Sequence, residues 1–180
     1  MAQEIEVKVL DIDSNNLQKR LEELGTQKIQ DTRLIVDWFR IKGIQEGEDP
    51  WFLRIRSNSE GKNEVTWKAK SNLEGIIRKH KEINFLIDES DKLEDLFEEL
   101  NLEKYAHQEK DRVSYVYNDW QFDIDTYPGM PAYLEVEGKS LKHIQEALQI
   151  LGVEKNRTWN QGERVLIQDI YGLDWYKMYF

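Results

Sequence analysis

The chain has 180 residues, of which 39% are hydrophobic and 33% charged, and its formal net charge is -10 at pH 7. This length allows a substantial buried core, and we expect residues 1–180 to form one domain. The acidic balance argues against general affinity for nucleic acids or anionic membranes, which attract basic surfaces. The lack of cysteine excludes disulfides, thiolate catalysis and cysteine-bound metals.

The N-terminal stretch, MAQEIEVKVL, has neither the basic nor the apolar region of a signal peptide. No apolar run approaches the length of a membrane-spanning helix. We therefore expect a cytoplasmic protein that does not act at a membrane.

The first predicted element is the stretch EIEVKV, residues 4–9, which alternates polar and aliphatic residues. Alternation predicts a β-strand with Glu4, Glu6 and Lys8 on one face. Seven further stretches alternate in the same way and end at Gly, Asn, Asp or Ser. They are DTRLIVDWFRI, WFLRIRS, EVTWKAK, IIRKHKEINFLI, EKDRVSYVY, WQFDID and YLEVEG. The sequence thus predicts about eight strands.

Three amphipathic helices are predicted between these strands, at residues 14–25, 90–102 and 140–152. Ser14 is the expected N-cap of the first, while Gly25 and Gly152 are expected to end the first and third. Each has one apolar stripe, so each should cover the apolar face of a sheet from outside. Residues 153–180 form a tail with a weaker helix at 160–173 and a dense aromatic end.

Charged residues recur in i, i+2 pairs on one face of the predicted strands. Three pairs are basic: Arg54 with Arg56, Lys68 with Lys70, and Lys110 with Arg112. Two pairs are acidic: Asp123 with Asp125, and Glu135 with Glu137. A solvated face intermixes the two signs, whereas here they segregate by strand. Eight strands can also close into a barrel that would place these faces inside, around one small ligand.

An interior of this kind suits a polyanion that carries a divalent metal ion. Arginine forks bind phosphate oxygens, while carboxylates bind hard cations such as Mg²⁺ or Mn²⁺. The sequence has neither a P-loop nor a GxGxxG motif. The pattern therefore indicates a phosphoryl-transfer site built on strands.

The ordered series of pairs resembles the CYTH superfamily, the triphosphate tunnel metalloenzymes. The resemblance rests on ExExK at residues 4–8, followed by RIR, KAK, KDR, DID and EVE, and covers residues 4 to about 152. It implies an α+β fold, in which a closed tunnel of eight antiparallel strands has helices packed outside. It also implies a triphosphate as the small-molecule substrate and Mg²⁺ or Mn²⁺ as the cofactor.

The resemblance assigns roles to residues as follows. The phosphates would be held by Lys8, Arg54, Arg56, Lys68, Lys70, Arg78, Lys110 and Arg112. The metal ligands would come from Glu4, Glu6, Glu82, Asp123, Asp125, Glu135 and Glu137. The catalytic set would be Glu4, Glu6, Lys8 and Glu137, with Glu6 or Glu137 orienting the attacking water.

One position departs from the family pattern. Relatives often carry RxExE on the fifth strand, whereas this chain has Arg78, His80 and Glu82. Glu82 alone would then carry the acidic role there, and His80 is either a phosphate or water contact or a partly exposed strand residue. His107 and His143 are expected at the surface.

The aromatic residues admit two interpretations. The tail aromatics, among them Trp175, are expected to pack on the outer wall. Alternatively, the tail closes one tunnel mouth and brings Arg157, Arg164 or Lys177 to the substrate. Trp38, Trp51 and Trp120 are interpreted as core or strand-end residues and not as a platform for a base.

Because no patch for a base is evident, the leading hypothesis is a metal-dependent hydrolase of inorganic triphosphate or a nucleoside triphosphate. A class IV adenylyl cyclase and a thiamine triphosphatase are the alternatives within the superfamily, and a non-catalytic polyphosphate-binding module is the alternative outside it. The sequence leaves the oligomeric state open, a homodimer included.

Overall fold

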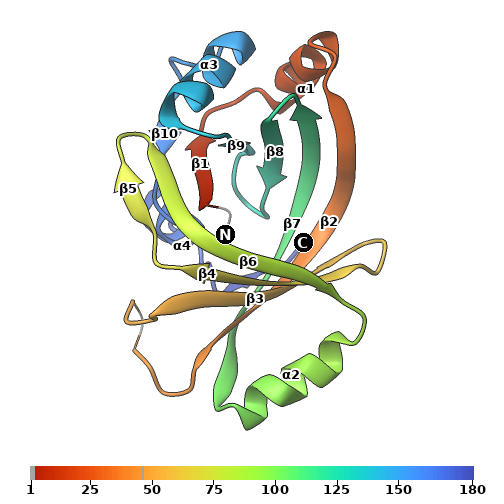
Figure 1. Ribbon diagram of the computed structural model, residues 1–180, viewed down its shortest axis with the longest axis vertical. Helices are drawn as coiled ribbons and strands as arrows, with labels where there is room; N and C mark the ends of the chain where they lie inside the picture. Colours follow the sequence, from red (N-terminus) through yellow and green to blue (C-terminus); the bar gives the residue numbers. More distant parts are fainter. Residues whose placement is uncertain (1–2, 46) are drawn as a thin grey trace.

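The chain folds into a closed antiparallel β-barrel with helices packed outside, as the sequence predicts. We describe residues 3–45 and 47–180 in a computed structural model (Figure 1). Eight strands form the barrel, in the order β1-β9-β8-β7-β2-β3-β4-β6. Strand β1 pairs with β9 on one side and with β6 on the other, which closes the barrel. Closure leaves the barrel without a free edge.

Each barrel strand corresponds to one predicted stretch, but β2 and β7 begin earlier than predicted, at Gln27 and Leu102. They are β1 (Gln3–Val9), β2 (Gln27–Ile41), β3 (Trp51–Asn58), β4 (Asn63–Ala69), β6 (Ile77–Ile87), β7 (Leu102–Tyr117), β8 (Trp120–Thr126) and β9 (Tyr133–Glu137). Three short strands, β5 (Asn72–Glu74), β10 (Thr158–Trp159) and β11 (Lys177–Met178), pair with β6, β1 and β7.

Helices α1 (Ser14–Glu23) and α3 (Leu141–Leu151) cover one end of the barrel, at the top of Figure 1. Their apolar stripes, which include Leu21 and Ile144, pack against the outward side chains of β1, β8 and β9. Gly25 and Gly152 follow the two helices with positive φ angles of 80° and 64°, as predicted. The predicted N-cap is wrong by one residue: Asp13, rather than Ser14, accepts the hydrogen bond from the Asn16 amide.

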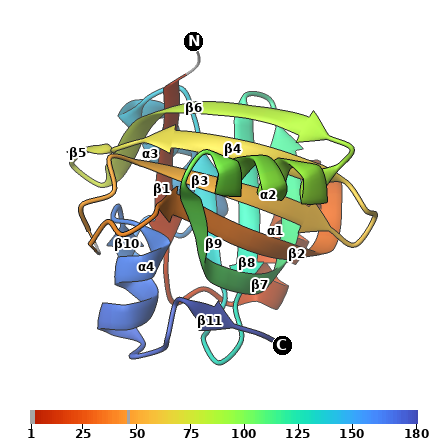
Figure 2. The ribbon, with the colours of Figure 1, turned by 90° about the horizontal axis from the view of Figure 1, so that it is seen from below.

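Helix α2 (Ser90–Glu99) covers the opposite end and runs across the outer face of the barrel (Figure 2). Phe97 packs edge-on against Phe39 of β2, with ring centroids 5.0 Å apart, and closes a small core with Leu53 and Val65. The outward faces of β2, β3 and β4 are therefore buried where the helix crosses them. None of the helices within residues 3–45 and 47–180 is long and apolar enough to cross a membrane.

The tail, residues 153–180, lies along the barrel, and part of it packs against side chains of the barrel interior. The weak predicted helix is a short α4 (Glu163–Val165) that continues as one π-helical turn, η1 (Leu166–Ile170). Leu166, Ile167 and Trp175 are buried in a core that also contains Trp38 of β2. The Trp38 and Trp175 ring centroids are 5.4 Å apart. This packing brings the start of α4 to the barrel lumen.

Candidate active site

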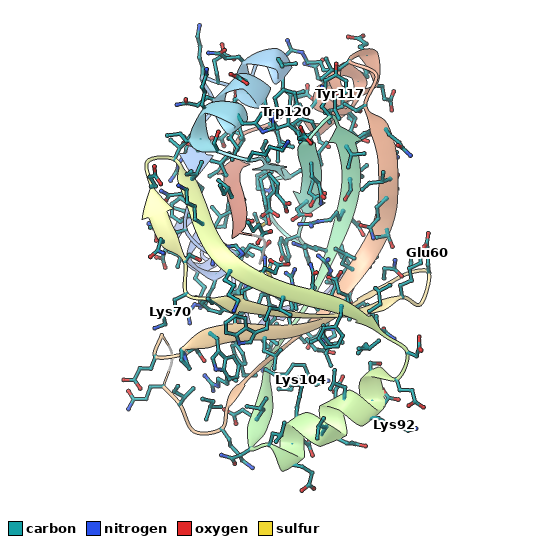
Figure 3. The ribbon with its side chains drawn as sticks, in the orientation of Figure 1. Glu60, Lys70, Lys92, Lys104, Tyr117 and Trp120 are labelled. Atoms are coloured by element: carbon teal, nitrogen blue, oxygen red, sulfur yellow. The ribbon has the colours of Figure 1, made fainter. Side chains whose placement is uncertain are left out.

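A cavity of about 560 Å³ occupies the barrel lumen, a volume within the usual range of small-molecule sites. The eight side chains predicted to hold phosphate all line it. These are Lys8, Arg54, Arg56, Lys68, Lys70, Arg78, Lys110 and Arg112. Lys70 is exposed just past the end of β4, where Figure 3 shows it at the edge of the barrel. Alternation along each strand explains the convergence, since inward positions recur every second residue.

Five of the seven predicted metal ligands also line this cavity. They are Glu4, Glu6, Glu82, Glu135 and Glu137. Strand β9 pairs with β1 so that Glu6 lies opposite Glu137 and Lys8 opposite Glu135. The acidic strands β1, β9 and β8 are neighbours, while the basic strands β3 and β4 lie across the barrel.

Lysines neutralise the carboxylates inside the cavity. Lys8 Nζ lies 3.2 Å from Glu6 Oε1 and 2.8 Å from Glu135 Oε2. Lys68 Nζ lies 3.0 Å from Glu4 Oε2 and 2.6 Å from Oε2 of Glu82. Burial opposes the charge on both lysines, but the neighbouring carboxylates outweigh it and raise the pKa of each ammonium group.

Asp123 and Asp125 are fully buried and do not line the cavity; they lie behind Arg112. Arg112 Nη1 lies 2.6 Å from Asp123 Oδ2, and Nε and Nη2 each donate to Asp125 at 2.6 Å. Burial opposes the charge on Asp125, but Arg112 outweighs it and lowers the pKa of that carboxyl. These ion pairs hold Arg112 in place. That Asp123 and Asp125 also bind a metal stays a prediction.

The arginines on the basic side of the cavity have fewer carboxylate partners than the two lysines paired with the acids. Arg56 Nη2 lies 2.6 Å from Glu64 Oε1. Arg54 has no carboxylate within salt-bridge distance among residues 3–45 and 47–180, and its buried Nε makes no hydrogen bond there. Burial and the neighbouring Arg54 guanidinium lower the pKa of Arg56. An anion bound between these arginines would relieve that repulsion.

Glu137 is a carboxyl without a basic partner among the described residues. Burial and the nearby carboxylates of Glu4, Glu135 and Asp123 raise the pKa of Glu137 to about 9. In the metal-free protein this side chain therefore carries a proton at neutral pH. A cation that replaced the proton would make it a ligand.

His80 is buried, which corrects the alternative that it is a partly exposed strand residue. It lies opposite Glu4 where β6 pairs with β1, and its Nε2 contacts Glu4 Oε2 and lies 3.4 Å from Glu82 Oε2. Burial opposes a charge on the imidazole, but Glu4 and Glu82 outweigh it and raise the pKa of His80. His107 and His143 are half-buried on outward positions, where His143 stacks on Trp120. Trp120 and its stacking partner Tyr117 lie at the end of the barrel near α3 (Figure 3).

Among residues 3–45 and 47–180, carboxylates and one imidazole form four groups, and the donor atoms within each group lie within 4.8 Å of one another. The four groups are Glu4–His80–Glu82, Glu4–Glu6–Glu137, Asp123–Glu135–Glu137 and Asp125–Glu135–Glu163. Oxygen donors at this spacing are the chemistry that Mg²⁺ and Mn²⁺ prefer. The residues present therefore fit a divalent ion, and Glu4 belongs to two of the groups.

The sequence interpretation missed Glu163, the first residue of α4. Glu163 Oε1 lies 2.9 Å from Lys110 Nζ and accepts a 2.7 Å hydrogen bond from Tyr133, while Oε2 accepts one of 2.9 Å from Tyr127. Burial opposes its charge, but Lys110 and Lys8 hold the pKa of Glu163 well below the usual value. Of the three tail cations considered, Arg164 lines the cavity, whereas Arg157 and Lys177 are exposed and do not.

We expect Glu163→Gln to lower the free energy of unfolding by about 1.5–3 kcal/mol, because it weakens one charged hydrogen bond and leaves Lys110 with Asp125 alone. Urea unfolding would measure the loss. Glu154→Gln, on an exposed tail position, is the matched control and should change stability by less than about 0.5 kcal/mol. Equal stability of the two variants would contradict the structural role of Glu163.

Four aromatic side chains line one part of the same cavity, and one of them is Trp38, which is also buried in the core as predicted. The four are Trp38, Phe52, Tyr105 and Trp175. Arg54 lies over Trp38, with Cζ 5.5 Å from the ring centroid. The lumen therefore has an apolar wall beside its basic side, which the sequence interpretation did not expect.

A closed antiparallel tunnel with basic and acidic inner walls defines a β-barrel of the triphosphate tunnel class. The family model of the CYTH domain matches residues 2–162, and the chain belongs to this family. A Methanocaldococcus jannaschii protein named "putative adenylate cyclase" is 29% identical over 150 residues, which cover 82% of this chain and 83% of that protein.

Solved structures share the fold. A protein of Vibrio parahaemolyticus described as a "putative adenylate cyclase" superposes with a TM-score of 0.74 at 10% identity, covering 93% of this chain and 99% of that one. A Hippeastrum protein described as a "putative adenylyl cyclase" with a dominant triphosphatase activity has a TM-score of 0.69 at 14% identity, over 94% and 96% of the two chains. At these identities the likeness concerns the fold alone.

Proposed function

We propose that the protein is a divalent-metal-dependent triphosphate hydrolase that cleaves inorganic triphosphate or a nucleoside triphosphate in the tunnel. The observation that carries the proposal is the pairing inside the cavity, where lysines occupy the positions beside the carboxylates. Family membership and the triphosphatase activity named for the Hippeastrum protein support it.

The ion pairs suggest how the substrate is accepted. A triphosphate that enters with a divalent ion brings both charges that the cavity needs. Glu4 and Glu6 would hold the metal ion, and Lys8 and Lys68, which pair with these carboxylates here, would turn to phosphate oxygens. The buried charges thus stay compensated in both states, which avoids the several kcal/mol that an unpaired buried charge costs.

Different residues would serve different parts of the reaction. Arg54 and Arg56 hold phosphate oxygens through their guanidinium forks. Arg112, whose three guanidinium nitrogens already bond to Asp123 and Asp125, adds positive charge from a fixed position. When bound, the metal ion supplies Lewis-acid stabilisation of the charge on the phosphoryl oxygens. Glu6 or Glu137 orients a water and accepts its proton while the water oxygen bonds to the terminal phosphorus. The bond to the leaving group breaks, and this group is pyrophosphate from inorganic triphosphate or a nucleoside diphosphate from a nucleoside triphosphate.

A class IV adenylyl cyclase is the second candidate, and the aromatic wall is the observation that favours it. An adenine ring could stack on Trp38 or Tyr105 while the phosphates lie beside Arg54. The 3′-hydroxyl would then attack the α-phosphate and release pyrophosphate. A thiamine triphosphatase would use the same wall for its own heterocycle, whereas a non-catalytic polyphosphate-binding module would need no acidic pairs.

Product analysis separates these functions. The purified protein is incubated with triphosphate, ATP or thiamine triphosphate and with Mg²⁺ or Mn²⁺, and phosphate, pyrophosphate and cyclic AMP are resolved. Phosphate release supports the hydrolase, while pyrophosphate with cyclic AMP from ATP would replace it with the cyclase. Tight metal-independent binding without turnover of any substrate would leave the binding module.

We expect the double variant Glu4→Gln, Glu6→Gln to lose activity by about 10³-fold or more, because it removes two charges that hold the metal. The matched control is Glu22→Gln, Glu23→Gln, which changes two exposed residues of α1 and should keep full activity. Circular dichroism would confirm that both variants fold. Full activity in the Glu4, Glu6 variant would refute metal binding by these acids.

A further inference from the structure

His80 lies at a position where its ring can act as a metal ligand. The side chain is fully shielded from solvent, and its Nε2 points between the carboxylates of Glu4 and Glu82. Its Nδ1 makes no hydrogen bond to the described residues, so no contact at Nδ1 among them fixes which ring nitrogen carries the proton. A buried imidazole whose Nε2 faces two acids and whose Nδ1 has no partner among the described residues needs an explanation.

The donor atoms of these three residues lie within 4.8 Å of one another. Donor atoms of a single first-row ion lie about 3–4 Å apart, since each metal–ligand bond is about 2.0–2.2 Å. The Lys68 ammonium, 3.0 Å from Glu4 and 2.6 Å from Glu82, occupies the same neighbourhood. Its charge marks the place where a cation is stable, and its four-carbon stem lets it withdraw toward the phosphates.

The two groups that share Glu4 differ in their donors. On the β9 side, Glu6 and Glu137 complete a group of carboxylates, which suits Mg²⁺. On the β6 side, His80 and Glu82 complete a group that includes an imidazole nitrogen. Imidazole favours Mn²⁺, Co²⁺, Ni²⁺ or Zn²⁺ over Mg²⁺, which takes oxygen ligands almost alone.

We propose that Glu4, His80 and Glu82 form a mixed nitrogen–oxygen site for a first-row transition-metal ion, distinct from the carboxylate group of Glu4, Glu6 and Glu137. The site rests on the proposed use of a metal by this tunnel. The Nε2 lone pair binds the ion, Glu4 bridges toward the other group, and Glu82 supplies the third donor. This chain would therefore prefer a transition metal over Mg²⁺ at one of its sites.

Pulsed electron paramagnetic resonance of the metal-free protein loaded with Mn²⁺ alone tests this directly. We expect nitrogen-14 modulation from a directly bound imidazole, replaced by nitrogen-15 signals when the protein is grown with nitrogen-15 histidine. The labelling needs no mutation, so it does not depend on how a variant folds. Manganese bound without nitrogen coupling would overturn the proposal.

Two variants test whether the nitrogen signal comes from His80 and whether His80 sets the preference for a transition metal over Mg²⁺. His80→Glu should abolish the modulation and reduce the ratio of Co²⁺ to Mg²⁺ affinity by about tenfold in calorimetric titrations. His107→Gln changes a histidine on an outward position of β7 and should leave both unchanged. A signal that persists in His80→Glu, or an unchanged affinity ratio, would contradict the assignment.

These readouts do not depend on turnover, so the two proposals can fail separately. Nitrogen coupling in a protein that cleaves no triphosphate would retain the metal site and remove the proposed reaction. Metal-dependent hydrolysis by a protein without nitrogen coupling would retain the reaction and remove His80 from the metal.

Discussion

Arg112→Met should lower the free energy of unfolding by about 3–5 kcal/mol, since it leaves the buried Asp123 without a basic partner among the described residues and Asp125 with Lys110 alone. Arg112 bonds to Asp123 and Asp125 at 2.6 Å and lies 3.4 Å from Glu135. Burial disfavours the charged guanidinium, yet the aspartates outweigh it and raise the pKa of Arg112. For a chain of this size the loss corresponds to a fall in Tm of about 6–20 °C.

A neighbouring pair provides the matched control. Arg33 on β2 bonds to Asp111 on β7, one residue before Arg112, but both partners are more than 40% exposed. Solvent-exposed pairs contribute about 0–1 kcal/mol, so Arg33→Met should change Tm little. Differential scanning calorimetry of both variants measures the contrast, and equal shifts would show that burial does not set the value of the Arg112 pairs.

A compensating variant tests the cause. If uncompensated charge destabilises Arg112→Met, adding Asp123→Asn and Asp125→Asn should recover part of the lost stability, because the charges of these two buried carboxylates are then removed. If the loss stems only from packing, the triple variant should be less stable than the single one. Stability measurements on the three variants distinguish these causes even if none is active.

The local pattern predicts the barrel strands well because alternation is a property of neighbouring residues. EIEVKV alternates, and β1 spans it with Glu4, Glu6 and Lys8 on the lumen side. The sequence also contains a signal that was not used for Asp125. Asn118 and Asp119 form the two-residue turn between β7 and β8, and the resulting register places Arg112 opposite Asp125. This register predicts an ion pair between Arg112 and Asp125. The family motifs instead assign Arg112 to phosphate and Asp125 to the metal.

Other features depend on contacts that a local pattern does not encode. His80 and Glu4 are 76 positions apart in the chain, and they meet only because the barrel closes between β6 and β1. Glu163 reaches Lys110 because the tail aromatics pack on the core around Trp38. A short helical pattern predicts neither where its first residue lies nor what it contacts. Long-range packing therefore determined the parts of the site that the sequence analysis missed.

The pKa of Glu137 predicts that raising the pH destabilises the metal-free protein. The folded state holds this proton up to about pH 9, whereas the unfolded chain releases it near 4.5. Between these values the folded state binds more protons, so the free energy of unfolding decreases as pH rises, by at most about 1.4 kcal/mol per pH unit from this group. Glu137→Gln removes this contribution.

We therefore expect Glu137→Gln to unfold at a higher temperature than the parent protein at pH 8.5 and at nearly the same temperature at pH 5. Metal should reverse the order at pH 8.5, because the ion replaces the Glu137 proton in the parent protein and has no such ligand in the variant. Thermal unfolding with and without Mn²⁺ gives all four comparisons, and Glu99→Gln on the exposed face of α2 is the control. If the unfolding temperatures of the parent protein and Glu137→Gln changed in parallel with pH, Glu137 would be ionised in the metal-free protein. Metal binding by Glu137 would then release no proton.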